Sequence, residues 1–144
     1  MNDFKELNIK EALVKGLAKD NIKIPTEIQQ LAIPQIMEGK DLIGEAVTGS
    51  GKTLAYLLPS FEKIDTESKD LHTLVIAPTH ELVLQIDRVI KTLGENAQYP
   101  VRSVSIIGNV NISRQIENLK SKPHIIVGTP GRILELIKKK KIKA

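Results

Sequence analysis

The segment Ala46–Thr53 reads Ala-Val-Thr-Gly-Ser-Gly-Lys-Thr and constrains the fold more than any other part of the chain. Gly49 and Gly51 allow several backbone N–H groups to turn toward one anion, and a helix that begins directly after them adds the positive end of its dipole. Such a loop is typical of the turn between a strand and a helix that binds a nucleoside triphosphate. We therefore predict that Lys52 contacts the outer phosphates and that the Thr53 hydroxyl binds Mg²⁺.

The loop departs from the general pattern Gly-x-x-x-x-Gly-Lys-Thr at one position, because residue 46 is Ala. Its surroundings fit the pattern. Residues 41–45 predict a short apolar strand before the loop, and apolar side chains recur at helical spacing after it, at Leu54, Leu57, Leu58 and Phe61. A Gly-Ser turn before Lys-Thr also occurs in proteins that bind no nucleotide, and the eight residues alone leave that alternative open.

The composition is that of an ordinary globular domain. A chain of 144 residues can bury one hydrophobic core but is short for two domains. Apolar residues make up 41% and charged residues 26%, and no apolar run approaches the roughly 18 residues that span a membrane. The N-terminus lacks the features of a secretion signal, and cysteine is absent. We therefore expect a cytoplasmic protein without disulfides, thiolate metal sites or membrane contact.

The net charge of +4 does not by itself indicate a polyanionic partner. Five lysines gather near the end of the chain, at Lys138, Lys139, Lys140, Lys141 and Lys143. Without them the acidic residues slightly outnumber the basic ones. The simplest interpretation of the run is a solvated helix end whose cations complement the negative end of the helix dipole.

Two capping patterns predict helices in the first part of the chain. Asn8 with Glu11 precedes one apolar helical stripe, and Thr26 with Gln29 precedes another. Gly39 suits the exit from the second helix, because glycine readily adopts the left-handed conformation that ends helices.

Four strand-to-helix units are predicted to follow, with strands at residues 41–45, 73–77, 101–107 and 124–127. This alternation favours an α/β fold with a mostly parallel sheet, right-handed crossovers and helices on both faces. In such a fold all four loops that follow the strands lie along the carboxyl edge of one sheet, where open α/β folds bind ligands.

Three further motifs accompany the loop: Pro25-Thr26-Glu27-Ile28-Gln29, Pro78-Thr79-His80-Glu81-Leu82-Val83 and Thr129-Pro130-Gly131-Arg132. With them, nearly the whole chain resembles the N-terminal part of the first RecA-like lobe of a DEAD-box ATP-dependent RNA helicase. That family also has Ala at the position of Ala46. The resemblance implies an RNA helicase that remodels or unwinds RNA by using ATP hydrolysis.

The resemblance also implies how the chain is organised. Residues 1–144 would form a partial RecA-like ATP-binding domain, truncated before the family's acidic strand. Residues 1–40 would supply the adenine-recognition helices, and residues 41–144 the strand–helix units. The family's second RecA-like lobe is not present in this sequence.

Gln29 is the residue that the resemblance assigns to the adenine edge. A side-chain amide offers one donor and one acceptor, as adenine N6 and N7 require. The residues themselves leave a second interpretation open, because Gln three positions after a Thr cap is an ordinary capping-box residue. Phe4 resembles the family's isolated aromatic, which lies 17 positions before the segment that begins at Asn21.

The resemblance implies ATP and Mg²⁺ as cofactors, with Lys52 and Thr53 as the catalytic residues and Thr53 on the metal. The predicted nucleotide-binding residues are Phe4, Lys23, Pro25, Thr26, Gln29, Ala46, Val47, Thr48, Gly49, Ser50, Gly51, Lys52 and Thr53.

By the same resemblance, RNA would be held through its backbone. The predicted RNA-binding residues are Pro78, Thr79, Gly108, Thr129, Pro130, Gly131 and Arg132. From the residues alone, Thr79 and Thr129 could be helix caps and Arg132 a surface side chain. With two Phe, two Tyr and no Trp, the chain offers few platforms for base stacking, so we expect little sequence preference.

Two residues depart from the family's RNA motifs. His80 replaces an arginine and exchanges a permanent cation for a ring that is mostly neutral at pH 7. Asn109 stands where the family usually has a second glycine, and its side chain adds bulk.

The family's Asp-Glu-Ala-Asp segment, which binds magnesium and positions water, does not occur in the sequence. Phosphoryl transfer depends on positioned metal, water and cations. We therefore expect residues 1–144 to bind ATP weakly and to hydrolyse it negligibly, and the incomplete sheet to leave an exposed edge.

Two alternatives are weighed beside the helicase interpretation. A non-catalytic module that binds nucleotide or RNA would share all of these motifs. An unrelated P-loop enzyme, such as a small kinase, would leave Phe4, Gln29 and Arg132 unexplained.

Overall fold

The computed structural model describes residues 3–143, which form two compact units. One consists of residues 3–63 and 93–99, and the other of residues 64–92 and 100–143. The division falls within one long helix, α4 (His80–Ala97). We refer to them below as the helical unit and the sheet unit.

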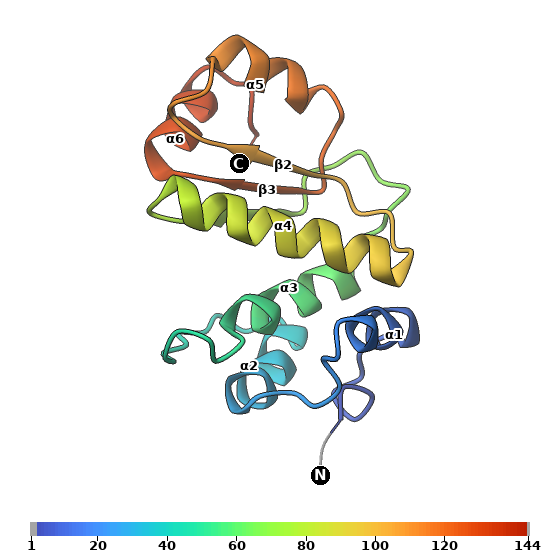
Figure 1. Ribbon diagram of the computed structural model, residues 1–144. Coiled ribbons are helices and arrows are strands. Elements are labelled where there is room, and N and C mark those ends of the chain that lie inside the picture. The colour runs from blue at the N-terminus through green and yellow to red at the C-terminus, as the bar shows by residue number, and fades with distance from the viewer. Residues whose placement is uncertain (1–2, 144) are drawn as a thin grey trace. The chain divides into compact units, whose positions relative to one another are not determined.

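The helical unit contains α1 (Glu11–Lys19), α2 (Glu27–Met37) and α3 (Lys52–Lys63), with the end of α4 (Figure 1). The predicted second capping box is confirmed: the Thr26 hydroxyl accepts from the backbone N–H of Gln29, whose side chain accepts from the backbone N–H of Thr26. Gly39 follows α2 with φ of +83°, as predicted for a helix exit.

The first predicted cap is wrong. Helix α1 has Lys10 at its N-cap without a side-chain cap bond, and Asn8 adopts a left-handed backbone with φ of 64°. The backbone N–H of Lys10 instead donates to the carboxylate of Glu62 on α3. The start of α1 is therefore capped by Glu62, which is distant in the sequence, and not by the local residue Asn8 that the pattern predicted.

The predicted strand at 41–45 is also wrong. These residues form no strand, all five are exposed, and Ile43 is 98% exposed. A strand exists only where a neighbour completes its hydrogen bonds. Within its described residues the helical unit contains no strand that could be this neighbour.

The sheet unit contains three parallel strands in the order β1-β3-β2: β1 (Thr73–Ile76), β2 (Ser103–Ile106) and β3 (Ile125–Gly128). Thr73 and Ser103 both pair with Ile125. The central strand β3 is buried along its whole length, as its unbroken apolar sequence predicts. Three of the four predicted strand-to-helix units are therefore confirmed.

Helices cover both faces of this sheet, with α5 (Ile112–Leu119) and α6 (Pro130–Lys138) on one face and α4 on the other (Figure 1). On the first face, Val104 and Ile106 pack with Ile126, Ile133 and Leu136. On the second, the Ser103 hydroxyl donates to the buried carboxylate of Asp87 on α4 at 2.7 Å. The parallel α/β architecture is thus as predicted, with the loops after β1, β2 and β3 along its carboxyl edge.

Candidate functional site

The loop at Ala46–Thr53 leads into α3, which begins at Lys52, and has the backbone that its glycines predict. Gly49 and Gly51 have φ of +82° and +86°. A Cβ atom at Gly51 would lie 2.4 Å from Nε2 of Gln29, so any side chain there would displace that amide. Conformation and space therefore both require glycine at position 51.

Two polar groups of this loop suit a phosphate. The Lys52 ammonium donates to the carbonyl oxygen of Ala46 at 2.5 Å, so it is turned toward its own loop. The Ser50 hydroxyl is buried and has no hydrogen-bond partner within the described residues. A buried hydroxyl without a partner is costly, and an anion in the loop would accept its hydrogen bond. The residues present therefore fit a triphosphate.

Gln29 uses both ends of its amide inside the protein. Its Oε1 accepts from the backbone N–H of Thr26 at 2.9 Å, and its Nε2 donates to the carbonyl oxygen of Gly51 at 3.1 Å. The side chain is 2% exposed. Gln29 thus joins the start of α2 to the Ala46–Thr53 loop, and contact with a base would require one of these bonds to be exchanged.

The other residues predicted to contact nucleotide differ in accessibility. Phe4 is fully buried, and Pro25 is buried as well, whereas Lys23 and Thr26 are exposed. The Phe4 ring therefore presents no free face to a base in this structure.

Thr53 lies in the first turn of α3 and is half-buried. Burial raises the pKa of the Tyr56 hydroxyl above its ordinary value, and the neighbouring Thr53 side chain partly offsets this rise. A hollow of about 450 Å³ lies beside the loop and is lined by Lys52, Tyr56 and the segment 40–42, among others.

In the sheet unit, the loops predicted to contact RNA follow the three strands. Pro78 and Thr79 follow β1 and are exposed, and the Thr79 hydroxyl accepts from the backbone N–H of Leu82 at 3.1 Å. Gly108 follows β2 and is exposed. The helix-cap interpretation of Thr79 is therefore confirmed, and its exposure leaves the residue accessible to a second partner.

The Thr129–Gly131 segment follows β3 and begins α6, with Pro130 in the first turn as predicted. The predicted side-chain cap by Thr129 is wrong, because its side chain makes no cap bond. Its backbone N–H donates instead to the carbonyl oxygen of Ile106 in β2 at 3.0 Å. Gly131 faces open space, since a Cβ atom there would meet nothing within 4 Å.

The alternative that Arg132 is an exposed surface side chain is wrong, because its side chain is 13% exposed. Its Nη2 donates to the carbonyl oxygen of Gly108 at 2.8 Å, and its Nη1 donates to the carbonyl oxygen of Val110 at 3.0 Å. The Nε pairs with the Glu135 carboxylate at 3.0 Å. The guanidinium therefore fixes the loop after β2 against α6.

Gln115 completes this contact and was missed by the sequence reasoning. It is 2% exposed, its Oε1 accepts from Nη1 of Arg132 at 3.1 Å, and its Nε2 donates to the carbonyl oxygen of Ile107 at 2.7 Å. The sequence carried a signal, because Gln115 lies among the apolar positions 112, 116 and 119 on the inward face of α5. A polar residue at a core-facing position needs a buried partner.

The two departures from the RNA motifs lie near these loops. Asn109 is exposed, and His80 begins α4 with a half-buried side chain. A Cβ atom at Gly108 would lie 3.9 Å from the His80 ring nitrogen Nε2, which places the two residues side by side.

Within residues 3–143, no group of three or more His, Cys, Asp or Glu side chains is arranged to hold a metal ion. Across the same residues, no helix is both long enough and apolar enough to cross a membrane. The residues that directly follow β1 and β3 carry no carboxylate.

Comparison with known proteins gives consistent matches. The family model for the DEAD/DEAH box helicase matches residues 26–144. The chain is 50% identical over 119 residues to the probable ATP-dependent RNA helicase YfmL of Bacillus subtilis (strain 168), covering 83% of this chain and 31% of that protein. It is 42% identical over 143 residues to the DEAD-box ATP-dependent RNA helicase CshA of Bacillus cereus (strain ATCC 10987 / NRS 248), covering 99% and 27%.

Solved structures agree. A DEAD box protein from the hyperthermophile Methanococcus jannaschii has a TM-score of 0.90 and 30% identity, covering 98% of this chain and 38% of that one. A hypothetical ATP-dependent RNA helicase from Sulfolobus tokodaii has a TM-score of 0.81 and 32% identity, covering 92% and 38%. The chain thus spans about a third of the length of these proteins.

Proposed function

The chain belongs to the DEAD/DEAH box helicase family, and from this premise we propose that it is the ATP- and RNA-contacting part of an ATP-dependent RNA helicase. The whole protein would remodel or unwind RNA, and residues 1–144 would contribute the N-terminal part of its first RecA-like lobe. The observation that carries the nucleotide part of this proposal is the buried, unpartnered Ser50 hydroxyl beside Lys52 in a loop shaped by two glycines.

In the proposed nucleotide site, the loop residues Ala46–Thr53 bind the triphosphate of ATP. Lys52 exchanges the carbonyl oxygen of Ala46 for a phosphate oxygen, and the Ser50 hydroxyl gains an acceptor. Mg²⁺, when bound with ATP, neutralises phosphate charge, and the Thr53 hydroxyl is its proposed protein ligand.

The proposed adenine site consists of Gln29 with Phe4, Lys23, Pro25 and Thr26. Gln29 would exchange its bond to Gly51 for the adenine edge, so that base recognition and the conformation of the phosphate loop change together. Phe4 would become the aromatic neighbour of the base only if the residues that cover its ring move. Contact of the base with Gln29 and contact with Phe4 therefore need different structural changes, so experiments can distinguish them.

The proposed RNA surface is the carboxyl edge of the sheet unit. The exposed residues Pro78, Thr79, Gly108, Pro130 and Gly131, with the half-buried Thr129, would contact phosphate and sugar. Arg132 would act chiefly by holding the Gly108 loop, because its donors already have partners. Backbone contact with few aromatic platforms implies little sequence preference.

Residues 1–144 lack the Asp-Glu-Ala-Asp segment, and we propose that they bind ATP without appreciable turnover. The test measures binding of a fluorescent ATP analogue and RNA-stimulated phosphate release by the purified chain. We expect saturable binding that Lys52→Ala weakens and that Lys19→Ala, a matched change of an exposed lysine, does not. Equal loss in both variants, or turnover of ~1 per second or more, typical of a kinase, would contradict the proposal.

The adenine assignment is tested with Gln29→Glu, which keeps an acceptor for the Thr26 N–H but loses the amide donor. We expect the preference for ATP over GTP to fall while α2 stays capped. Unchanged relative affinity for the two nucleotides would remove Gln29 from the base site and leave it as a capping residue.

A further inference from the structure

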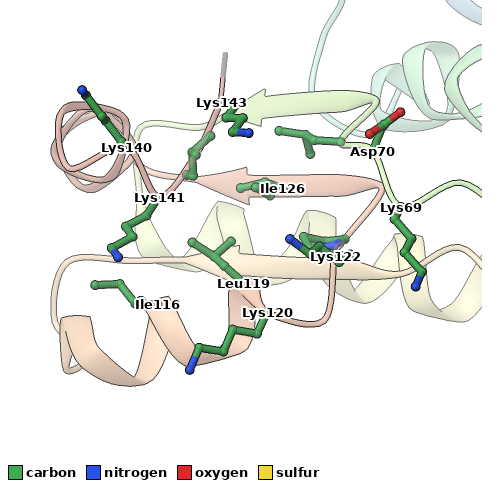
Figure 2. Close-up of a pocket in the computed structure, with 13 residues that line it drawn as sticks. Lys69, Asp70, Ile116, Leu119, Lys120, Lys122, Ile126, Lys140, Lys141 and Lys143 are labelled. Carbon is green, nitrogen blue, oxygen red and sulfur yellow. The ribbon is translucent and has the colours of Figure 1, made fainter.

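A hollow of about 490 Å³ in the sheet unit has an apolar floor and a rim of lysines, a size typical of ligand pockets. The floor is formed by Leu71, Ile116, Leu119, Pro123, Ile126 and Ile142. The rim carries Lys69, Lys120, Lys122, Lys140, Lys141 and Lys143. Figure 2 shows these lysines spread around the apolar side chains of Ile116, Leu119 and Ile126.

The hollow lies over the face of the sheet that α5 and α6 cover: Ile126 lies within β3, and Ile142 belongs to the same core cluster as Ile106 and Ile133. Leu71 and Pro123 come just before β1 and β3, and Lys120 and Lys140 come just after α5 and α6. Figure 2 shows Lys69, Asp70 and Lys122 near the beginnings of the strands, and Lys140 and Lys141 toward the end to which the strand arrows point. The lining of the hollow shares no residue with the set proposed to contact RNA.

Two of the lysines are held in position by the backbone. Lys122 and Lys140 have left-handed φ of 56° and 59°, directly after α5 and α6. Their N–H groups donate to the carbonyl oxygens of Leu119 and Ile137 at 3.2 and 2.9 Å, which is the usual way in which a helix ends. The backbone of these two rim positions is therefore held by the fold, which directs both side chains from defined points on the rim.

The positive charge of the rim is only partly compensated. Lys120 pairs with Glu117 at 2.9 Å, and Asp70 also lines the hollow. In the described part of the chain the other five rim lysines make no ion pair. Each helix end adds about half a negative charge. A clear excess of positive charge therefore remains over an apolar floor.

We propose that this hollow binds an acidic peptide segment of a partner protein, in which Asp and Glu residues flank one or two large apolar side chains. The apolar side chains would occupy the floor over Leu119 and Ile126, and the carboxylates would pair with the lysines. Such a segment matches both the apolar floor and the lysine rim. Burial of its apolar side chains would supply affinity, and its carboxylates would set its orientation.

RNA is the competing occupant and fits the hollow less well. The lining contains no aromatic side chain on which a base could stack and no arginine to form a forked contact with phosphate. A phosphate backbone would use the lysines but would leave the apolar floor uncovered.

The experiment measures binding of a fluorescein-labelled peptide of Asp, Glu and Leu to the chain, residues 1–144. A second peptide, in which Ser replaces each Leu, reports on charge alone, and labelled oligouridylate reports on RNA. The test variant is Lys69→Glu with Lys141→Glu. Its matched control is Lys5→Glu with Lys19→Glu, which makes the same change of net charge at exposed lysines of the helical unit.

We expect the test variant to weaken binding of the Leu peptide by about tenfold, since exposed ion pairs each contribute a small factor, and the control variant to change it little. The Ser peptide should bind several times more weakly, and oligouridylate should not displace the Leu peptide. Amide NMR shifts at Leu71, Leu119 and Ile126 should accompany binding. Equal affinity for the two peptides, displacement by oligouridylate, or equal loss in both variants would each overturn the proposal.

Discussion

The loop at Ala46–Thr53 and the carboxyl edge of the sheet unit are both proposed binding regions. They differ in how many of their polar groups already have hydrogen-bond partners within the protein. In the first, the Ser50 hydroxyl is buried without a partner in the described structure, and the preceding residues 41–45 are unpaired and exposed. In the second, Arg132 and Gln115 donate three hydrogen bonds to the loop after β2, at the carbonyl oxygens of Ile107, Gly108 and Val110. The comparison indicates that the loop after β2 is held by hydrogen bonds within the sheet unit, whereas the Ser50 hydroxyl has no such partner within the described residues.

The largest expected effect comes from two isoleucines that contrast these regions. Ile126→Ala opens a cavity under α5 and α6 and should cost about 2–5 kcal/mol of unfolding free energy. Ile43→Ala removes a side chain that is 98% exposed and should cost less than about 0.5 kcal/mol. Urea unfolding of both variants measures the difference. A comparable loss at Ile43 would mean that the 41–45 segment is packed in solution.

The next effect concerns the contact that fixes the RNA-side loop. Arg132→Met keeps much of the side-chain length but removes its donors from the carbonyl oxygens of Gly108 and Val110 and from Gln115. We expect a loss of about 1.5–3 kcal/mol, because partners of a charged, nearly buried group are left unsatisfied. Faster amide exchange at residues 108–111 should accompany it.

Arg132→Lys sharpens the same test, since it keeps the charge but cannot reproduce the fork of donors. If RNA affinity falls in Arg132→Met but is restored in Arg132→Lys, charge at phosphate is what matters. If both variants lose RNA affinity together with the exchange protection of the loop, Arg132 acts by positioning Gly108.

The regions also differ in how well the sequence predicted them. The run His124-Ile-Ile-Val-Gly predicted β3 because a central parallel strand is apolar on both faces and needs no distant information to be recognised. The shorter apolar stretch at Leu42 and Ile43 predicted a strand over residues 41–45 that does not form, because pairing depends on a neighbour that the local sequence cannot reveal.

Contacts of long sequence separation explain the other differences. Three partners of Arg132 lie 17 to 24 residues away, at Gly108, Val110 and Gln115, so the local motif could not reveal how its donors are used. The cap of α1 comes from Glu62, which lies 52 residues from Lys10. By contrast, the capping box of Thr26 and Gln29 and the positive φ of Gly49 and Gly51 are local, and the sequence predicted them correctly.

A smaller effect is expected from pH at the amino edge of the sheet unit. His124 is fully buried; its Nδ1 accepts from the backbone N–H of Arg102 at 3.0 Å, and its Nε2 contacts the carbonyl oxygen of Ser68 at 3.0 Å. Burial, with the Arg102 guanidinium, lowers the pKa of His124 below its ordinary value of 6.5. Between the lowered pKa and about pH 6.5, His124 is therefore mostly protonated in the unfolded chain and mostly neutral in the folded chain.

The stabilising contribution of neutral His124 should therefore be present above about pH 6.5 and should be lost as the pH falls below that value toward the lowered pKa. Urea unfolding at about pH 7.5 and about pH 5.5 measures the loss. His124→Gln, which keeps an acceptor and a donor but does not titrate, should show a smaller difference between the two pH values. An equal difference would assign the pH dependence to other groups.

The smallest change in stability is expected at Ser50. This variant tests the contrast between the two regions most directly, because the contrast depends on the Ser50 hydroxyl having no partner within the described residues. Ser50→Ala removes a buried hydroxyl that has no partner in the described structure, so the unfolding free energy should stay constant or rise by up to about 1 kcal/mol. Affinity for a fluorescent ATP analogue should nevertheless fall. Ser60→Ala is the matched control, because the Ser60 hydroxyl already donates to the carbonyl oxygen of Tyr56 on α3. A clear loss of stability in Ser50→Ala with unchanged nucleotide affinity would show that the loop satisfies itself, and the contrast between the two regions would fail.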